Sequence, residues 1–316
     1  MMGPRIWQIR DQALDVGSAG LIMGVLNVTP DSFSDGGRFM DASAAIEHGI
    51  EMARLGAAII DVGGESSRPG ADSISAREEM ARVLPVIQGL RSAISAFISI
   101  DTRKAEVAKA ALDEGADVVN DITAGADPEM LPLIAKRKAA IVLMHMKGEP
   151  KTMQESPHYS DVVGEVVNFF RQRYACALDW GVDPMAIAFD PGIGFGKTLE
   201  HNLALLRNLG QLRAENRPMV VGVSRKSFLR KLIESPVPDP GLAGTVALTA
   251  LLRSKGADVL RVHDVAENMQ ALRLTNAVVQ SSNSNVQPVT RVKERPGFPM
   301  SRCGLEQREV GDGDRV

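Results

Sequence analysis

Polar residues that could bind a ligand follow a series of short apolar runs in this chain. They are Asn27, Asp61, Glu65, Asp101, Asn120, Asp121, His145, Asp190, Ser224, Arg225, Lys226, Arg261 and His263. Asp101, Asn120 and Asp190 suit a flat, nitrogen-rich heterocycle better than a sugar, because a carboxylate accepts two parallel N–H bonds and an amide both donates and accepts. Lys226 would then neutralise carboxylate charge or contact a ring carbonyl, although an ion pair with Asp190 is the simpler alternative.

Arg261 and His263 predict an anion site. One residue of a short strand separates them, so both side chains point to the same side. A guanidinium and an imidazole suit an anion with several oxygens, such as a phosphate or a diphosphate. A buried pair of Arg261 with a carboxylate, beside a packed His263, is the alternative for these two residues alone.

Two polar loops follow the first two apolar runs. Residues 21–26 are sized for a buried strand, and the loop at 29–37 (TPDSFSDGG) carries Phe33 and Asp35. Residues 57–62 form the second run, and 63–70 (GGESSRPG) follow it. Enzymes with parallel sheets place their sites in loops at the carboxyl ends of strands. For the first loop taken alone, an ordinary connection between strand and helix is the alternative.

The elements that must position these residues alternate between strand and helix, which predicts a parallel α/β fold. The same Gly-Ala pair precedes three of the apolar runs, within residues 55–57, 114–116 and 255–257. A glycine helix cap that recurs at one structural point indicates a repeated unit. About eight units in roughly 250 residues predict a (β/α)8 TIM barrel. An open doubly wound sheet is the alternative, but no dinucleotide-type glycine motif follows a strand.

The barrel is expected to be a single domain at residues 21–279. Residues 1–20 form a lead-in that is expected to be a hairpin closing the bottom of the barrel. Residues 280–316 lose all periodicity and are predicted to be a disordered polar tail. Within the barrel, helices are expected to begin at Asp41 and at Asp127-Pro128, and Ser75 with Glu78 forms a capping box.

Composition restricts the partners of the protein. A net charge of −3 over 316 residues gives no bias toward nucleic acid or an anionic membrane surface. No run approaches about 18 apolar residues, so no membrane span is expected. Two cysteines and the lack of a signal-peptide pattern predict a cytoplasmic protein. Pro191 replaces the first glycine that a P-loop needs, and the histidines lack the spacing of a zinc site.

Eight ordered blocks give the chain a specific resemblance to the dihydropteroate synthase family, which joins a dihydropterin methyl diphosphate to p-aminobenzoate. The blocks are 27–37 (NVTPDSFSDGG), 61–70 (DVGGESSRPG), 101–103 (DTR), 120–121 (ND), 145–154 (HMKGEPKTMQ), 190–197 (DPGIGFGK), 224–228 (SRKSF) and 261–265 (RVHDV). The resemblance extends over residues 5–278. Ser67 departs from the family, which commonly has threonine there, but the hydroxyl is retained.

The resemblance implies roles for the matching residues. The residues implied to hold the pterin are Asp101, Asn120, Asp190 and Lys226. Those implied for the diphosphate are Asn27, Arg261 and His263, with Asn27 near Mg2+ and Asp35 joining it when the first loop closes. Those implied for p-aminobenzoate are Phe33, Ser66, Ser67, Arg68, Pro69, Phe195, Lys226 and Ser227. Asp101, Lys226, Arg261 and His263 are the implied catalytic set. The family is also dimeric, and sulfonamides are its expected inhibitors.

In this family the diphosphate leaves before the aniline attacks, so the site must stabilise a delocalised pterin cation rather than supply a strong base. Mg2+, Arg261 and His263 would stabilise the leaving charge, and Asp101 and Asp190 the cation. A pterin-binding methyltransferase is an alternative, although it has no use for Phe33 and Arg68. A Schiff-base aldolase would need Lys226 in a pocket that lowers its pKa. A non-enzymatic paralogue would be expected to lose loop residues that this chain retains.

Overall fold

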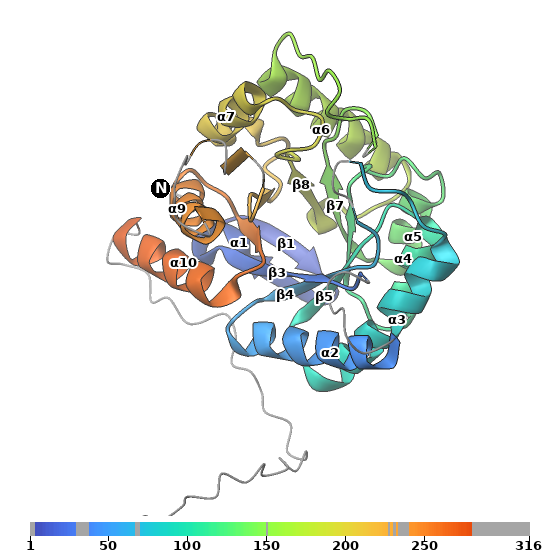
Figure 1. Cartoon of the computed structure of the whole chain (residues 1–316). Coiled ribbons are helices and arrows are strands. Elements are labelled where there is room, and N and C mark those ends of the chain that lie inside the picture. Colours follow the sequence, from blue (N-terminus) through green and yellow to red (C-terminus); the bar gives the residue numbers. More distant parts are fainter. Residues whose placement is uncertain are drawn as a thin grey trace, which may run out of the picture.

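A ring of strands surrounded by helices forms the molecule (Figure 1). The structure is a computed structural model that describes residues 4–29, 38–66, 70–149, 151–226, 228–229, 232 and 240–279. The strands of the ring are β3 (Leu21–Asn27), β4 (Ile59–Gly63), β5 (Phe97–Asp101), β6 (Val118–Asp121), β7 (Ala140–Met144), β8 (Ile187–Asp190), β9 (Val220–Gly222) and β10 (Val259–Val262). The helices between and after them are α2 (Arg38–Arg54), α3 (Ala76–Ala93), α4 (Ala105–Asp113), α5 (Met130–Arg137), α6 (Val162–Asp179), α7 (Leu199–Arg207), α9 (Pro240–Ser254) and α10 (Val265–Val279). Two short 3-10 helices, η2 (Pro184–Ala186) and η3 (Leu209–Leu212), complete the connections.

The sheet is parallel and closes on itself. Its eight strands lie in the order β8-β7-β6-β5-β4-β3-β10-β9, and every neighbouring pair is parallel. A parallel bridge between Phe189 and Met219 joins the two ends, and the Phe189 N–H donates to Pro218 O at 2.9 Å. The predicted (β/α)8 barrel is confirmed, and the doubly wound alternative is excluded because the ring follows the order of the chain.

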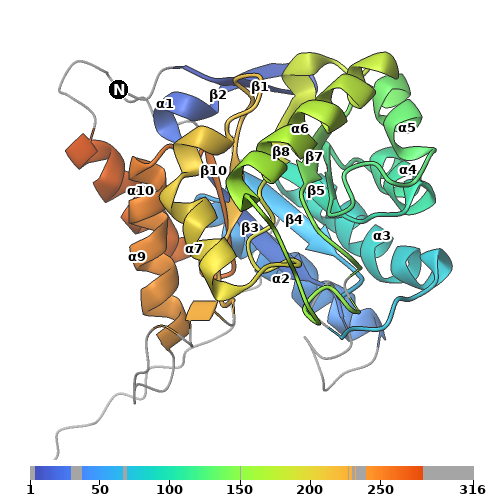
Figure 2. The same ribbon diagram turned by 90° about the horizontal axis from the view of Figure 1, so that it is seen from above.

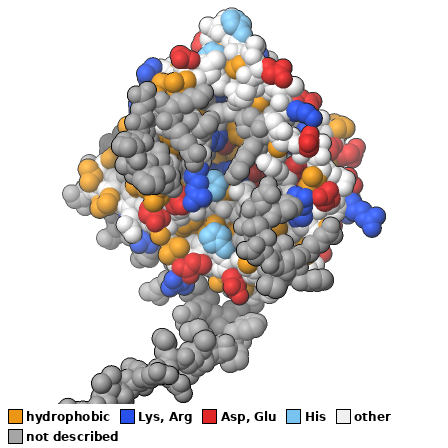
Figure 3. All heavy atoms as spheres, in the orientation of Figure 1, with side chains coloured by type: hydrophobic (Ala, Val, Ile, Leu, Met, Phe, Trp, Pro, Cys, Tyr) orange, Lys and Arg blue, Asp and Glu red, His pale blue; other side chains and the backbone are white. Residues whose placement is uncertain are grey.

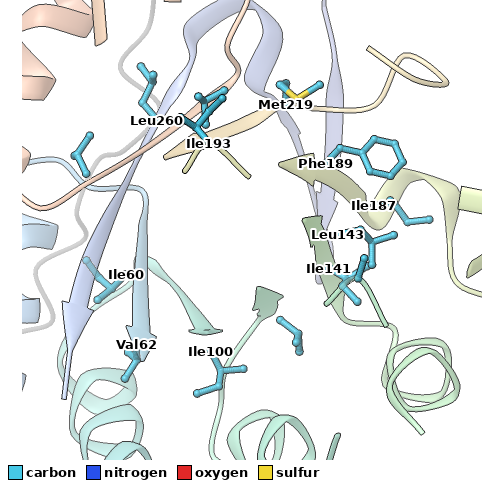
Figure 4. Close-up of a cluster of buried hydrophobic side chains, with 14 of the residues drawn as sticks. Ile60, Val62, Ile100, Ile141, Leu143, Ile187, Phe189, Ile193, Met219 and Leu260 are labelled. Carbon is cyan, nitrogen blue, oxygen red and sulfur yellow. The ribbon is translucent and has the colours of Figure 1, made fainter. Parts of the chain in front are cut away.

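The strands bury both faces, as the apolar runs predicted. Ile60, Val62, Ile100, Ile141 and Leu143 belong to the main core, which also contains side chains of the surrounding helices (Figure 4). A second cluster fills the lower interior of the barrel and contains residues of alternate position, such as Ile59 and Val118. Each strand therefore presents one set of side chains to the helices and the other set to the interior.

A hairpin covers one end of the barrel, as predicted (Figure 2). It consists of β1 (Ile6–Ile9) and β2 (Gln12–Asp15), followed by the short helix α1 (Val16–Ala19). Trp7 is fully buried in the lower cluster, and its Nε1–H donates to Ala186 O at 2.9 Å. Arg5 donates to Asp258 Oδ1 from Nε at 2.8 Å. With this end closed, ligands must enter from the carboxyl ends of the strands.

The repeated glycine step is confirmed, since Gly56, Gly115 and Gly256 have φ of 106°, 107° and 101°. Only glycine adopts such angles without steric cost, so it stops each helix before the next strand. Ser75 caps α3 as predicted and accepts the Glu78 N–H at 3.2 Å, but the Glu78 side chain does not complete the capping box and instead accepts from Arg82 Nη2 at 2.6 Å.

Two predicted helix starts were wrong. Helix α2 begins at Arg38 and not at Asp41, because residues 38–40 contain no glycine or proline that would prevent helix formation. Helix α5 begins at Met130 and not at Asp127, whose carboxylate instead accepts the N–H groups of Glu129 at 3.0 Å and Ala105 at 2.8 Å. The predicted tail, residues 280–316, lies outside the described residues. Among the helices that the structure describes, none is long and apolar enough to cross a membrane.

Candidate active site

Alternation along the strands decides which polar strand-end residues face the interior. On β4, Ile60 and Val62 pack in the layer under the helices, so Asp61 between them faces inward. The same parity turns the following residues inward: Asn27, Asp61, Asp101, Asn120, Asp190 and Arg261. It turns Asp121 and His145 toward the helices, although both seemed equivalent to the others in the sequence. Figure 3 looks onto this open face, where basic and histidine side chains lie around a central hollow.

Arg261 is the centre of the inward set. Its Nε donates to Asp61 Oδ2 at 2.6 Å, and its Nη2 donates to Asp101 Oδ2 at 2.6 Å. Asn120 Nδ2 also donates to Asp61 Oδ2, at 3.1 Å. Strands β10, β4 and β5 therefore meet through one guanidinium, and Asn120 joins β6 to them through Asp61. Arg261 pairs with two carboxylates and not with the single one of the alternative, and these pairs hold its guanidinium at the mouth of the barrel.

The charges of this group are strongly coupled. Burial raises the pKa of Asp101 to about 7, although the neighbouring Arg261 favours its ionised form. Burial would lower the pKa of Arg261, but Asp61 and Asp101 outweigh this and raise it above its usual value. One guanidinium thus lies between two carboxylates, and a cationic ring against Asp101 would favour the ionised form that burial opposes.

Asp190 and Lys226 form the opposite wall. Asp190 Oδ1 accepts the Gly192 N–H at 2.7 Å, which leaves Oδ2 for a ligand. Lys226 Nζ donates to Ile193 O and lies 4.6 Å above the centre of the Phe195 ring. Burial lowers the pKa of Lys226 to about 8, against the opposing effect of Asp190. The hydrogen bond to a carbonyl positions Lys226 on the loop, and no carboxylate among the described residues forms an ion pair with it.

His263 is fixed beside Arg261 by Ser224. The His263 backbone N–H donates to Ser224 Oγ at 3.2 Å, and Nδ1 of the ring lies 3.0 Å from the same oxygen. The ring therefore has a defined orientation at the end of β10 and can present Nε2 to a ligand. Arg261 and His263 are brought to one place, as the sequence predicted.

Other strand-end residues serve the scaffold. Asp121 accepts three hydrogen bonds at 2.6–2.8 Å, from the Thr123 N–H and hydroxyl and from the Gly125 N–H. Glu65 pairs with Arg103 at 3.1 Å and with Lys104, and Arg225 pairs with Asp264. Because these groups are satisfied within the protein, they shape the loops and leave the ligand to the inward set.

Several predicted site residues cannot be placed. Phe33, Asp35, Ser67, Arg68, Pro69 and Ser227 lie outside the described residues. Ser66 is described and lines a pocket together with Asp101 and Arg103, so the second loop leaves the barrel next to the pterin candidates. Asn27 ends β3 beside Gly63, at a position that also neighbours Asp101.

Sequence reasoning left two residues out of the site. In the sequence, Asp61 was one of several carboxylates at strand ends. Only its position two residues after Ile59, which faces the interior of the barrel, could have placed its side chain there. Lys197 was considered only as the lysine of a failed P-loop. It is 2% exposed and donates to the carbonyls of His145, Gly192 and Phe195 at 2.9–3.2 Å.

The fold agrees with comparisons to known proteins. Residues 23–263 match the family described as "Pterin binding enzyme". The chain is 46% identical over 265 residues to the dihydropteroate synthase of Synechocystis, covering 84% of this chain and 92% of that protein. It is 42% identical to the Escherichia coli dihydropteroate synthase, covering 83% of this chain and 93% of that protein.

Solved structures show the same likeness. The Yersinia pestis dihydropteroate synthase in a sulfonamide complex has a TM-score of 0.81 at 40% identity, covering 86% of this chain and 98% of that one. The Xanthomonas albilineans enzyme with 4-aminobenzoic acid has a TM-score of 0.81 at 40% identity, covering 87% and 98%. The same enzyme with 7,8-dihydropteroate has a TM-score of 0.77 at 37% identity, covering 86% and 98%. This chain belongs to the pterin-binding enzymes and, within that family, to the dihydropteroate synthases, which are transferases.

Proposed function

We propose that the inward-facing set at the mouth of the barrel condenses (7,8-dihydropterin-6-yl)methyl diphosphate with p-aminobenzoate, giving 7,8-dihydropteroate and diphosphate. The observation that carries the proposal is the meeting of Asp61, Asp101 and Asn120 around Arg261, opposite Asp190 and Lys226. The related Xanthomonas albilineans enzyme has been solved with 7,8-dihydropteroate, which supports a site of this chemistry.

In the proposal, four side chains hold the pterin. Asp190 Oδ2 and the Asp101 carboxylate accept the N–H groups of the ring, and Asn120 supplies a donor and an acceptor. Lys226 contacts the ring carbonyl from above Phe195. Carboxylates that burial makes hard to ionise become easier to ionise when a cationic ring lies against them, so they stabilise the cation that forms during the reaction.

Arg261 and His263 receive the leaving group. The bond that breaks joins the pterin methylene carbon to a diphosphate oxygen, and its electron pair leaves with the oxygen. A guanidinium held by two carboxylates cannot swing away, and His263 is oriented by Ser224. Preorganised cations of this kind stabilise developing negative charge without reorganising during the reaction. The aniline nitrogen then attacks the carbon and loses a proton to solvent.

Magnesium fits the same corner of the site. Mg2+ prefers oxygen ligands, and it usually takes one or two from the protein and the rest from water and substrate phosphates. Asn27 offers an amide oxygen on the side of Gly63, next to Asp101. We propose that Asn27 holds the ion, with Asp35 as a second ligand. The ion would supply charge neutralisation for the diphosphate oxygens.

The p-aminobenzoate pocket would lie between Phe195, Lys226 and the loop that begins at Ser66. Phe33, Ser67, Arg68, Pro69 and Ser227 are the other proposed contacts. The related Xanthomonas and Yersinia enzymes have been solved with 4-aminobenzoic acid and a sulfonamide drug, respectively. Sulfonamides are therefore expected to compete with p-aminobenzoate here.

The experiment is diphosphate release from the dihydropterin substrate in Mg2+, with and without p-aminobenzoate. Release that depends on p-aminobenzoate and yields dihydropteroate supports the proposal. Tight pterin binding with no condensation would contradict it and favour a non-enzymatic paralogue or a methyltransferase. Replacing Mg2+ with a chelator should reduce turnover, and full activity in the chelator would exclude the ion.

We also propose a cytoplasmic homodimer that pairs through the last two helices. Leu251 on α9 is 48% exposed, and Leu274 and Val278 on α10 are 68% and 84% exposed. Exposed large apolar side chains on two helices that pack against each other are typical of interfaces. Val278→Asp should convert a dimer to a monomer in sedimentation velocity, and a wild-type monomer would contradict this.

A further inference from the structure

The loop that leaves β8 is built around the buried amino group of Lys197, whose pKa burial lowers to about 7, so that the group is cationic below this pH. Lys197 Nζ donates to Gly192 O at 3.0 Å, Phe195 O at 2.9 Å and His145 O at 3.2 Å, and it lies 3.0 Å from His145 Nδ1. A lysine has three donors, and these partners are neutral. The group thus resembles a cation in a cage of carbonyl oxygens. An anion cannot take the place of these oxygens, so Lys197 does not bind phosphate as the lysine of a P-loop would.

This ammonium joins two neighbouring loops. His145 follows β7, whereas Gly192 and Phe195 belong to the loop that follows β8. The loops touch through their backbones, since a Cβ on Gly192 would lie 2.0 Å from His145 O and one on Gly196 2.1 Å from Lys147 O. The three carbonyl oxygens lie within 3.2 Å of Lys197 Nζ, and oxygens that converge on one point repel one another unless a cation lies among them.

The loop that Lys197 holds carries three contacts of the proposed site. Its Gly192 N–H donates to Asp190 Oδ1 at 2.7 Å, its Ile193 O accepts Lys226 Nζ, and its Phe195 ring lies 4.6 Å below that Nζ. If the loop changed shape, Asp190 and Lys226 would both lose the groups that orient them.

We propose that Lys197 is a positioning residue that acts as a tethered cation and sets the geometry of Asp190 and Lys226 without touching substrate. This inference rests on the proposed function, because its effect is read through pterin binding and turnover. A purely structural role would alter stability alone. A positioning role requires that affinity, turnover and the presence of a cation change together.

The test is chemical rescue. Lys197→Ala removes the side chain beyond Cβ, and propylammonium can restore an ammonium at the same place. At pH 6, below the pKa of about 7 of Lys197, Lys197→Ala should lose about tenfold or more in pterin affinity by calorimetry and in kcat/KM. Propylammonium should increase the pterin affinity and the kcat/KM of the variant several-fold and raise its Tm. Propanol and tetramethylammonium chloride at equal concentration should do neither.

Two further variants keep the result interpretable. Lys197→Met preserves volume without charge, so it should fold, bind pterin weakly and gain nothing from amine. Lys255→Ala is the matched control, because Lys255 is an exposed lysine that bonds one carbonyl, Arg207 O at 3.3 Å. It should match the wild type and show no rescue.

Wild-type affinity and turnover in both Lys197 variants would overturn the proposal, as would equal rescue by propanol. A lower Tm with unchanged pterin affinity would also overturn it. Failure of the proposed function is distinguishable, since the wild type and Lys255→Ala would then fail to bind pterin as well. The amine-dependent Tm of Lys197→Ala would still report on the cation site in that case.

Discussion

Arg261 on β10 donates from Nε to Asp61 Oδ2 on β4 at 2.6 Å, although strand β3 lies between β10 and β4 in the sheet. Asp61 is fully buried, and its other oxygen, Oδ1, has no hydrogen-bond partner among the described residues. Asp61 therefore fixes a guanidinium at the mouth of the barrel at the cost of one unsatisfied acceptor. Such buried, incompletely satisfied groups occur where function constrains the structure.

Asp61→Asn should lower kcat/KM for the dihydropterin substrate about 10–100-fold, because a hydrogen bond to a charged group contributes about 1.5–3 kcal/mol. The amide retains one acceptor for Arg261 or Asn120, so the fold should persist. Steady-state kinetics provide the measurement. Asp113→Asn breaks the exposed pair with Arg137 and serves as the control. Equal kcat/KM in the wild type and Asp61→Asn would show that Asp61 does not act in the site.

Asp190→Asn should weaken pterin binding about 10–150-fold in calorimetry, since an amide cannot accept two parallel N–H bonds as a carboxylate does. Its oxygen can still accept the Gly192 N–H, so the loop should keep its shape. Asp179→Asn, at the exposed end of α6, is the control and should bind as the wild type does. Identical affinities for all three proteins would argue against the pterin assignment.

Phe195→Leu should raise the KM for p-aminobenzoate about 3–10-fold, because the proposed pocket loses an aromatic wall and aromatic pairs contribute about 0.5–1.5 kcal/mol. Pterin affinity should change little, since Asp190 and Lys226 keep their hydrogen bonds. The matched control is Phe97→Leu, because Phe97 begins β5 at the end of the strand away from Asp101 and the site. An equal loss of both substrates would show that the two pockets are not separate.

His145→Asn should reduce the loss of unfolding free energy that the protein shows as the pH falls. Burial, and secondarily Lys197, lowers the pKa of His145 from 6.5 to about 3, so the folded protein keeps the ring neutral. Its stabilising contribution is therefore present above pH 6.5 and is lost as the pH falls toward 3. Urea unfolding between these limits should show the wild type losing up to ~1.4 kcal/mol per pH unit more than the variant. The exposed His48→Asn should follow the wild type. Parallel curves for wild type and His145→Asn would contradict the shift.

Asp258→Asn should destabilise the protein by about 3–5 kcal/mol, because it leaves buried arginine charge without its partner. Asp258 accepts from Arg5 at 2.8 Å, Arg213 at 3.1 Å and the Met219 N–H at 2.9 Å, all at the closed end of the barrel. Substrate KM values should remain unchanged because the site lies at the other end. Denaturant unfolding and kinetics together test this, and a shift in KM with normal stability would be the contrary result.

The barrel and most of the site could be read from the sequence because both depend on local patterns. The glycine steps before Ala57, Ala116 and Ala257 recur where each helix ends, and the apolar runs have the length of buried strands. The predicted starts of helices α2 and α5 were wrong. Asp127 has the side chain of a cap, but its carboxylate bonds to Ala105 on a neighbouring helix, a contact that no local pattern contains.

The sequence by itself determined that carboxylates, an amide and basic groups would stand at the ends of parallel strands, because those residues follow apolar runs of fixed length. The tertiary structure decided which of them share a ligand. Closure of the sheet brings Arg261 against Asp61 and Asp101, from positions 200 and 160 residues away. It also turns Asp121 toward its own loop and gives Lys197 its carbonyl cage. Hydrogen bonds depend on distance and direction, and only the closed barrel defines these for residues so far apart in the chain.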